Sequence, residues 1–224
     1  MTYSILALEP KRRILGVAVA SGAIAVGSRV PWAKALTGAV ATQAYTNPSL
    51  GPIILKLIEL GYRASKAVKY ALTLDPKPEL RQVAAIDIHG DMGVHTGTNT
   101  PQWSGELIDR DNLCLCIGNL ICGSKVLEEM HKAYVEAEGK DFAERLLLAL
   151  SMGHRVGGDK RGDRSAAILI VGTTEYNPYY DKILDLRVDY SLNPVEDLIK
   201  LYRNLSIAFN FNANTTSSTL LHLN

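Results

Sequence analysis

The sequence predicts an α+β protein, a four-layer helix–sheet–sheet–helix (αββα) sandwich of two packed, mainly antiparallel sheets. Residues 14–20 and 166–171 are apolar throughout instead of alternating, which is typical of strands that are covered on both faces. The connections between strands are hairpins and pairs of helices, which argues against a purely parallel sheet. Two sheets packed face to face, with helices outside each, cover both faces of such strands.

The chain opens with a predicted β-hairpin. Residues 2–8 and 14–21 are β-rich runs, and the charged connector 9–13 between them carries Pro10 at a position that suits an early turn residue. A weaker apolar run at residues 38–41 indicates a further buried strand.

Two helix pairs are predicted. The first covers about residues 51–61 and 65–74, with Pro52 at the first helical position and Gly61 as a stop. The second covers about residues 124–139 and 141–154. Asp141, with Glu144 three residues later, forms a variant capping box at the start of its second helix.

The remaining elements follow from alternation and turn signals. We expect strands at residues 83–88, 92–96, 106–109, 113–118 and 166–171. Residues 183–190 alternate apolar and charged residues, which predicts an exposed edge strand, and a last helix runs from Pro194 to about Leu205. Residues 1–205 are thus expected to form one domain, and residues 206–224, mostly Asn, Thr and Ser, a polar C-terminal tail that frays.

The composition is that of an ordinary soluble globular protein, with 47% apolar and 21% charged residues in 224. The formal net charge of +1 gives no electrostatic reason to expect nucleic acid or an anionic membrane as a partner. No apolar run approaches the roughly 20 residues that span a bilayer. The start of the chain lacks a basic segment followed by an apolar one, so we expect a cytoplasmic protein acting on a small molecule, with homo-oligomerisation left open.

The three cysteines, Cys114, Cys116 and Cys122, fit a reducing compartment, because an odd number is a poor disulfide framework. No histidine or carboxylate lies at ligand spacing beside them in the sequence. We therefore expect small buried hydrophobic residues here, no metal site and no cofactor.

Three residues are candidates for catalysis. Thr2 would carry a hydroxyl and a free α-amine on one residue if Met1 were removed, although it could equally be a β-branched residue that opens a strand. Ser21 ends the second strand on the same face as Val17 and could supply a hydroxyl, or could bond only to local backbone. Asn119 could donate its amide to a developing oxyanion, or serve as a turn residue.

The densest polar segment is residues 157–165, which lie between a helix and a buried strand. Such a loop can aim backbone N–H groups and cations at an anionic or oxyanionic group, but three glycines and five charges also describe a solvated connector. The candidate binding residues in this loop are Asp159, Lys160 and Arg164.

Two further polar positions follow predicted strands. His95 lies at a strand end, where it could be a general acid or base or simply a structural residue. Residues 42–48 read as a polar loop after a buried strand, and this loop contains Thr42 and Gln43.

These segments together resemble an uncharacterised bacterial and archaeal family of unknown function that is assigned to the N-terminal-nucleophile (Ntn) hydrolase fold. The motifs that carry the resemblance are residues 16–21, 25–28, 30–33, 38–44, 46–48, 95–97, 118–120, 157–162 and 185–189. The match covers about residues 2–205. Many members of the family carry a cysteine at the position of Thr100 and a histidine at that of Glu106, so neither group is required by the chemistry if this protein is active.

The resemblance implies an αββα sandwich and relatives that cleave amide bonds with an N-terminal Thr, Ser or Cys. Carried onto this chain, the nucleophile is Thr2 after loss of Met1, and its α-amine, with a reference pKa of about 8, is the base. The substrate-binding candidates are Ser28, Thr42, Gln43, His95, Asp159, Lys160 and Arg164. The competing hypotheses are a non-catalytic metabolite-binding protein on the same scaffold, and hydrolysis by the internal hydroxyl of Ser21.

Overall fold

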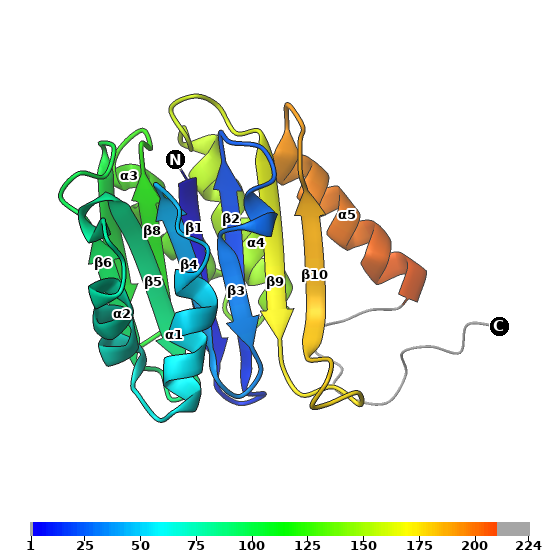
Figure 1. Ribbon diagram of the computed structural model, residues 1–224. Coiled ribbons are helices and arrows are strands. Elements are labelled where there is room, and N and C mark those ends of the chain that lie inside the picture. Colours follow the sequence, from blue (N-terminus) through cyan, green and yellow to red (C-terminus); the bar gives the residue numbers. More distant parts are fainter. Residues whose placement is uncertain (1, 210–224) are drawn as a thin grey trace.

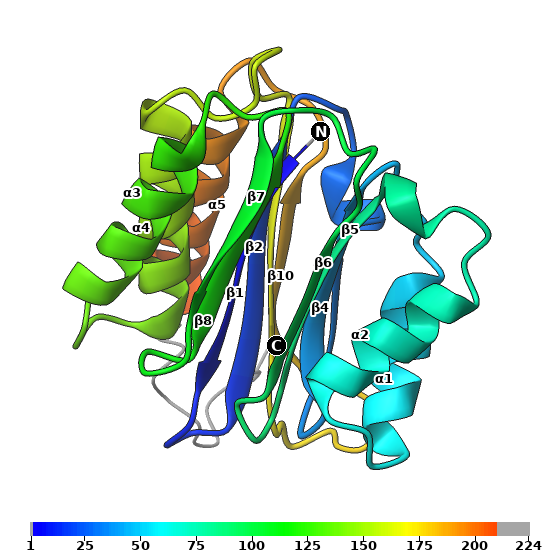
Figure 2. The ribbon, with the colours of Figure 1, turned by 90° about the vertical axis from the view of Figure 1, so that its left-hand side faces the viewer.

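A computed structural model describes residues 2–209, and it forms the predicted αββα sandwich of two antiparallel sheets (Figures 1 and 2). The six-stranded sheet has the order β10-β9-β2-β1-β8-β7, and the four-stranded sheet the order β3-β4-β5-β6. The strands are β1 (Thr2–Glu9), β2 (Ile14–Ser21), β3 (Pro31–Lys34), β4 (Gly38–Ala44), β5 (Arg81–Asp87), β6 (Met92–Thr96), β7 (Ser104–Asp109), β8 (Cys114–Asn119), β9 (Ser165–Val171) and β10 (Lys182–Val188).

The helices form the two outer layers. Figure 2 shows α3 (Ser124–Glu136), α4 (Phe142–Arg155) and α5 (Pro194–Phe209) on the outer face of the six-stranded sheet. On the outer face of the other sheet lie α1 (Leu50–Glu59) and α2 (Ala64–Thr73). Two short 3-10 helices, η1 (Val26–Ser28) and η2 (Pro78–Leu80), precede β3 and β5.

The position of the six-stranded sheet explains why its central strands are apolar throughout. Successive side chains of a strand point to opposite faces. In β1, Tyr3 and Ile5 therefore pack among α3 and α4, whereas Leu6 and Leu8 pack against the second sheet. Both faces are dry, so neither can carry a polar row, and the prediction from residues 14–20 and 166–171 is confirmed.

The strand β3 was missed by the sequence analysis, because Pro31–Lys34 is short and its pattern is weak. Its Trp32 packs against the core beneath α1 and α2. A Cβ at Gly51 would lie 2.3 Å from the Trp32 ring, so α1 can approach β3 closely only with glycine there.

Two predicted boundaries were wrong. Strand β4 continues to Ala44, so Thr42 and Gln43 belong to a strand and not to a loop. Both side chains are buried with hydrogen-bond partners, which makes the polar residues compatible with the strand. Helix α5 runs to Phe209 instead of ending near residue 205; the Ser206 hydroxyl donates to the Tyr202 carbonyl within this last stretch. The rest of the predicted tail, 210–224, lies outside the described residues.

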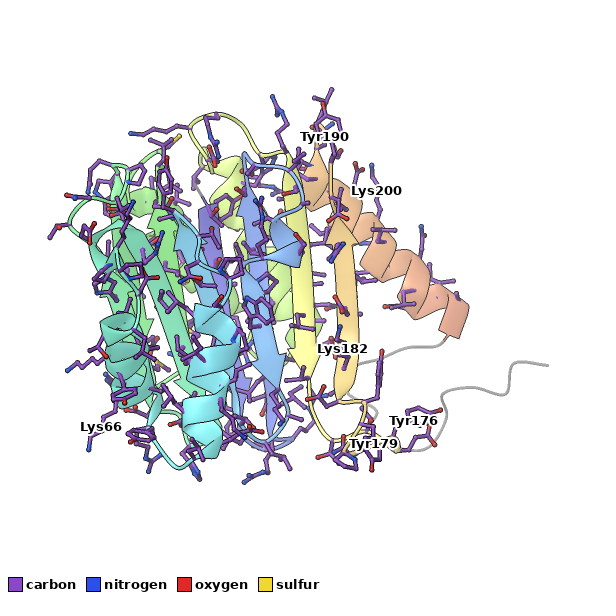
Figure 3. The ribbon with its side chains drawn as sticks, viewed as in Figure 1. Lys66, Tyr176, Tyr179, Lys182, Tyr190 and Lys200 are labelled. Carbon is purple, nitrogen blue, oxygen red and sulfur yellow. The ribbon has the colours of Figure 1, made fainter. Side chains whose placement is uncertain are left out.

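Strand β10 is the edge strand that its alternation predicts. Its exposed charges pair locally, Lys182 with Asp185 and Arg187 with Asp189, and charged side chains on an edge discourage pairing with other chains. Figure 3 shows Lys182 and Tyr190 near opposite ends of this edge. None of the helices within residues 2–209 has the length and apolar character that a bilayer crossing requires.

We expect Gly93→Ala to destabilise the packing of α2 on β6. The new Cβ would lie 2.7 Å from backbone atoms of both Ala64 and Ser65, and a backbone neighbour cannot move aside as a flexible side chain can. The free energy of unfolding, measured by chemical denaturation, should fall by about 1–3 kcal/mol. Lys66→Ala, at an exposed position of the same helix (Figure 3), is the control and should change it by less than about 0.5 kcal/mol.

Candidate functional site

The layer between the sheets changes from apolar to polar at the end where β1 begins. Thr2 and Ser4 lie on the same face of β1 as Leu6, because side chains two apart share a face. They are buried with four polar side chains from other strands: Ser21, Gln43, Gln82 and Asn119. We call these six residues the polar cluster.

Thr2 occupies the centre of this cluster. In the antiparallel register it lies opposite Ser21 of β2 on one side and Asn119 of β8 on the other. Its Oγ1 is 3.1 Å from Ser21 Oγ, and its carbonyl accepts a hydrogen bond of 3.1 Å from Gln43 Nε2 across the sheet interface. Two of the three predicted catalytic residues, Thr2 and Ser21, are thus in direct contact.

Asn119, the third predicted catalytic residue, also faces Thr2. Its Nδ2 lies 3.5 Å from the Thr2 carbonyl and 2.9 Å from Gln82 Oε1. Its Oδ1 is buried and accepts no hydrogen bond from the described residues. A buried acceptor without a partner is costly, and an additional donor near Thr2 would satisfy it.

Gln82 connects the two sheets, and the sequence analysis missed it. Its Oε1 accepts hydrogen bonds from Gln43 (2.8 Å) and Asn119. Its Nε2 lies within 3.1 Å of three oxygens, the Thr96 hydroxyl and the carbonyls of Gly105 and Gly118. Because this amide has two protons for three acceptors, at least one proton must be shared between two acceptors.

A neighbouring pair extends the cluster outward. The Thr96 hydroxyl donates to Glu106 Oε2 at 2.6 Å, and Glu106 belongs to β7 of the other sheet. Thr100 lies three residues after Gly97, in the loop that follows β6, and its hydroxyl donates to the Gly97 carbonyl. The two positions at which the chain departs from the family pattern therefore lie close to β6 and the loop that follows it.

The loop 157–164 is anchored to the end of β2 next to the polar cluster. The buried carboxylate of Asp159 accepts from the backbone N–H of Gly22 at 2.8 Å and pairs with the Arg161 guanidinium at 2.9 Å. The backbone N–H of Arg164 donates to the Ser21 carbonyl at 2.7 Å. The predicted position of this loop between a helix and a buried strand is confirmed, since α4 precedes it and β9 follows it.

A chain of four side chains, Tyr3, Asp163, His154 and Glu196, connects this loop to β1, α4 and α5. Asp163 Oδ2 accepts from the Tyr3 hydroxyl at 2.6 Å and lies 2.7 Å from His154 Nδ1. His154 Nε2 in turn lies 3.3 Å from Glu196 of α5. Burial, followed by the Asp163 charge, raises the pKa of Tyr3 well above its usual value, so Tyr3 is a neutral donor. The hydrogen bond to Asp163 raises the pKa of His154, while partial burial opposes the shift.

Of the seven predicted binding residues, Gln43 belongs to the polar cluster, and Asp159 and Arg164 belong to the loop 157–164 beside it. The other four lie elsewhere. Ser28 is exposed and donates to the Ala25 carbonyl, and the Thr42 hydroxyl donates to the Asn47 carbonyl. His95 lies opposite Val83, on the face toward the helices, with its Nε2 2.8 Å from the Pro78 carbonyl. Lys160 is exposed, and its ammonium donates to the Gln102 carbonyl.

A surface hollow of about 470 Å³ lies at the other end of the four-stranded sheet. It is lined by residues that include Thr37, Arg63, Asp87 and His89. Asp87 pairs with Gly38 at one end of β4, whereas Gln82 pairs with Gln43 at the other. The hollow is therefore separate from the polar cluster.

Comparison with protein families gives one match, to a model described as "Family of unknown function (DUF1028)", over residues 2–198. The chain belongs to this family. Among solved structures, protein SPO2555 from Silicibacter pomeroyi, of the same family, has a TM-score of 0.82 and 30% identity, covering 92% of this chain and 86% of that one. The expectation that the chain belongs to a family of unknown function is thereby confirmed.

More distant structures share little with this DUF1028 protein. Anbu (ancestral beta-subunit) from Yersinia bercovieri gives a TM-score of 0.41 at 10% identity, with 98% of this chain and 100% of that chain covered. An Anbu (Gly-1) mutant from Hyphomicrobium sp. strain MC1 gives 0.41 at 13% identity with the same coverage. Structural similarity at this level is too low to support a conclusion about this chain. A search of the curated proteins finds no match.

We expect Gln82→Leu to destabilise this DUF1028 protein, because it leaves the buried amides of Gln43 and Asn119 without their shared acceptor. Each orphaned buried polar group costs about 1–3 kcal/mol, so the free energy of unfolding should fall by at least about 2 kcal/mol. Chemical denaturation measures it, with the exposed Gln102→Leu as control. A loss of less than about 0.5 kcal/mol, the size of effect expected for a surface substitution, would contradict the role given to Gln82.

We expect the His154–Asp163 contact to make stability depend on pH. Because the folded pKa of His154 is raised, its stabilisation is complete below the unfolded value of about 6.5 and is lost as the pH rises through the folded value. The difference in unfolding free energy between wild type and His154→Gln should therefore shrink as the pH rises from about 6 to about 9. In an Asp163→Asn background the same difference should be nearly independent of pH.

Proposed function

We propose that this protein is an Ntn-type amidohydrolase that cleaves an amide bond of a small cytoplasmic substrate, with Thr2 as the nucleophile. The observation that carries the proposal is the position of Thr2 at the start of a central strand, with Oγ1 3.1 Å from the Ser21 hydroxyl. Support also comes from the αββα layers and from the motif resemblance to a family assigned to the Ntn-hydrolase fold.

The proposed reaction begins with the removal of Met1, which frees the α-amine of Thr2. The amine accepts the proton of Thr2 Oγ1 as this oxygen attacks the substrate carbonyl. The tetrahedral intermediate collapses to an ester on Thr2, and the departing amine takes the proton. Water then attacks the ester, again with the α-amine as base, and releases the acid.

The neighbours of Thr2 have separate roles in this proposal. The Ser21 hydroxyl orients Thr2 Oγ1 by the hydrogen bond between them. Asn119 Nδ2, or backbone N–H groups of the loop 157–164, stabilise the oxyanion. The buried Asn119 Oδ1, which accepts no hydrogen bond from the described residues, is available to accept one from the freed amine.

Access to Thr2 sets a condition on the proposal. Thr2 is only 3% exposed and Ser21 is fully buried. A substrate therefore requires that Met1 is removed or that other groups at this end of the sandwich move. The same burial favours the second candidate function, a non-catalytic metabolite-binding protein in which the hydroxyls of Thr2 and Ser21 are structural. That candidate predicts thermal stabilisation by a metabolite with Met1 retained and no product.

The test needs no known substrate. Intact-mass measurement of the purified protein should show loss of Met1, and a fluorescent β-lactone, an electrophile that acylates hydroxyl nucleophiles, should label Thr2 as mapped by peptide mass spectrometry. Thr2→Ala should abolish labelling, and Thr2→Ser should retain it, because serine keeps the hydroxyl and the α-amine. Thr98→Ala, an exposed threonine in a loop, is the control and should label like wild type.

Two results would overturn the proposal: Met1 retained on the soluble protein, or labelling unchanged in Thr2→Ala. Labelling of Ser21 with Met1 retained would instead favour the internal hydroxyl as nucleophile. A panel of small amides incubated with wild type and Thr2→Ala then measures turnover, which should fall to the background rate in the variant.

A further inference from the structure

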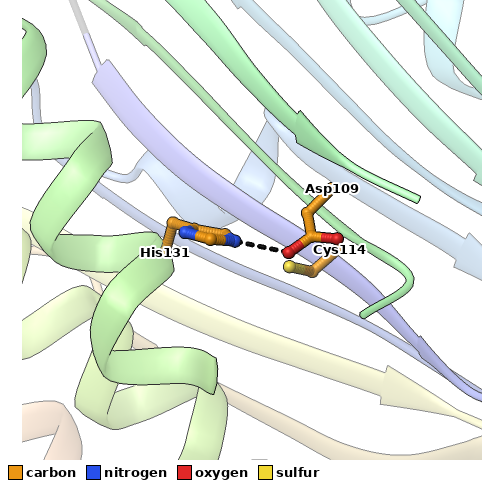
Figure 4. Close-up of side chains that lie close together, drawn as sticks. All are labelled: Asp109, Cys114 and His131. Atoms are coloured by element: carbon orange, nitrogen blue, oxygen red, sulfur yellow. Dashed lines mark hydrogen bonds and ion pairs between the residues drawn. The ribbon is translucent and has the colours of Figure 1, made fainter. Parts of the chain in front are cut away.

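Three side chains of the types that bind transition metals meet far from the polar cluster (Figure 4). Asp109 is the last residue of β7, Cys114 is the first residue of β8, and the two lie directly opposite each other in the antiparallel register. His131 reaches them from α3, which packs on this sheet. The same register pairs Ser104 with Asn119 five residues away, so this group lies about 16 Å along the strand from the Thr2 end.

The three side chains point toward a common point in Figure 4. His131 Nε2 lies 2.6 Å from Asp109 Oδ2, and the ligand atoms of all three residues lie within 4.8 Å of one another. The Cys114 thiol is fully buried, whereas the Asp109 and His131 side chains are 16% and 26% exposed. The group is thus closed on the sheet side and open to solvent on the other.

The carboxylate of Asp109 is held in place by its own turn. Its Oδ1 accepts from the backbone N–H groups of Asp111 (3.0 Å) and Asn112 (2.9 Å), and its Oδ2 from Asn112 Nδ2 (2.8 Å). His131 projects from a helix of 13 residues, which also fixes its position. Hydrogen bonds that orient a ligand in this way are typical of the surroundings of metal sites.

We propose that Asp109, Cys114 and His131 form a binding site for a divalent transition metal, zinc above all, with a water as the fourth ligand. A thiolate and an imidazole nitrogen select zinc over magnesium or calcium, which prefer oxygen ligands. Ligand atoms around tetrahedral zinc lie about 3.3–3.6 Å apart, so the sulfur must move closer to the other two ligand atoms by at most about 1.2 Å. The imidazole nitrogen, now 2.6 Å from the carboxylate, must move slightly away from it.

Binding also requires the loss of a proton. Burial raises the pKa of the Cys114 thiol to about 12, so this group is protonated until a metal binds. The zinc–sulfur bond forms as the S–H proton leaves to solvent, and the metal then carries a thiolate and a carboxylate. The thiolate and the carboxylate together carry two negative charges, which balance the two positive charges of the metal at this half-buried site.

The test uses the full chain, stripped with a chelator and titrated with Co²⁺ and Zn²⁺. We expect one equivalent of Co²⁺ to give the sulfur-to-cobalt charge-transfer absorption and the intense visible bands of a tetrahedral thiolate site, both displaced by Zn²⁺. Calorimetry should show one site for Zn²⁺. His131→Gln should weaken Zn²⁺ binding by at least about tenfold, since it removes one of three protein ligands.

The controls separate this site from other causes. Cys122→Ser removes the exposed cysteine, which is outside the group, and should bind like wild type. Cys114→Ser should abolish the charge-transfer band; because this residue is buried, circular dichroism checks that the variant is folded, and His131→Gln provides a second, less buried variant. Retained binding in both His131→Gln and folded Cys114→Ser, or no stoichiometric binding by wild type, would overturn the proposal.

Discussion

The buried amide of Gln82 is the interaction on which the Thr2 end of the molecule depends. Two sheets can pack through apolar side chains alone, as they do along most of their length. At the Thr2 end they pack through hydrogen bonds, and Gln82 makes them to both sheets. A buried polar group is tolerated only when its partners are in place, so each amide in this cluster fixes the next. The polar cluster thus specifies one register between the two sheets.

The same constraint places Thr2 beside Ser21. Strand β1 lies between β2 and β8, so its hydrogen bonds on both sides must agree on one register. A slip of one residue would turn Thr2 and Ser4 toward α3 and α4 and bring Tyr3 between the sheets. The Tyr3 hydroxyl would then lose Asp163, its partner beneath the loop 157–164. The contact of the two hydroxyls is therefore held from both faces of the strand.

The sequence could predict the layers because apolar periodicity is a local property. Strands without a polar face require cover on both sides wherever their partners come from. The candidate site was only partly predictable. Thr2 and Ser21 were found because their positions at the ends of a hairpin have chemical meaning. Gln82 was not, because its partners Gln43 and Asn119 lie more than 35 residues away and nothing local distinguishes it from any polar residue at a strand start.

The ligand group at the other end of the sheet was missed for a similar reason. His131 meets Cys114 only because α3 packs on β8, and no spacing rule covers a distance of 17 residues across a turn and a helix. The sequence analysis therefore placed no metal ligand beside the cysteines, whereas the fold brings both an imidazole and a carboxylate there. A site whose residues have a fixed spacing in the sequence can be predicted from the sequence. A site that forms only when distant elements pack together cannot.

The charge balance around Thr2 bears on the proposed function. The hydrogen-bond partners of the Thr2 hydroxyl and carbonyl are the neutral groups of Ser21, Gln43 and Asn119. The nearby carboxylate of Asp159 is paired with Arg161. An α-amine freed at Thr2 would therefore have neutral hydrogen-bonding groups beside it. A general base must be unprotonated to act, and neutral neighbours, unlike a carboxylate, do not favour the charged ammonium.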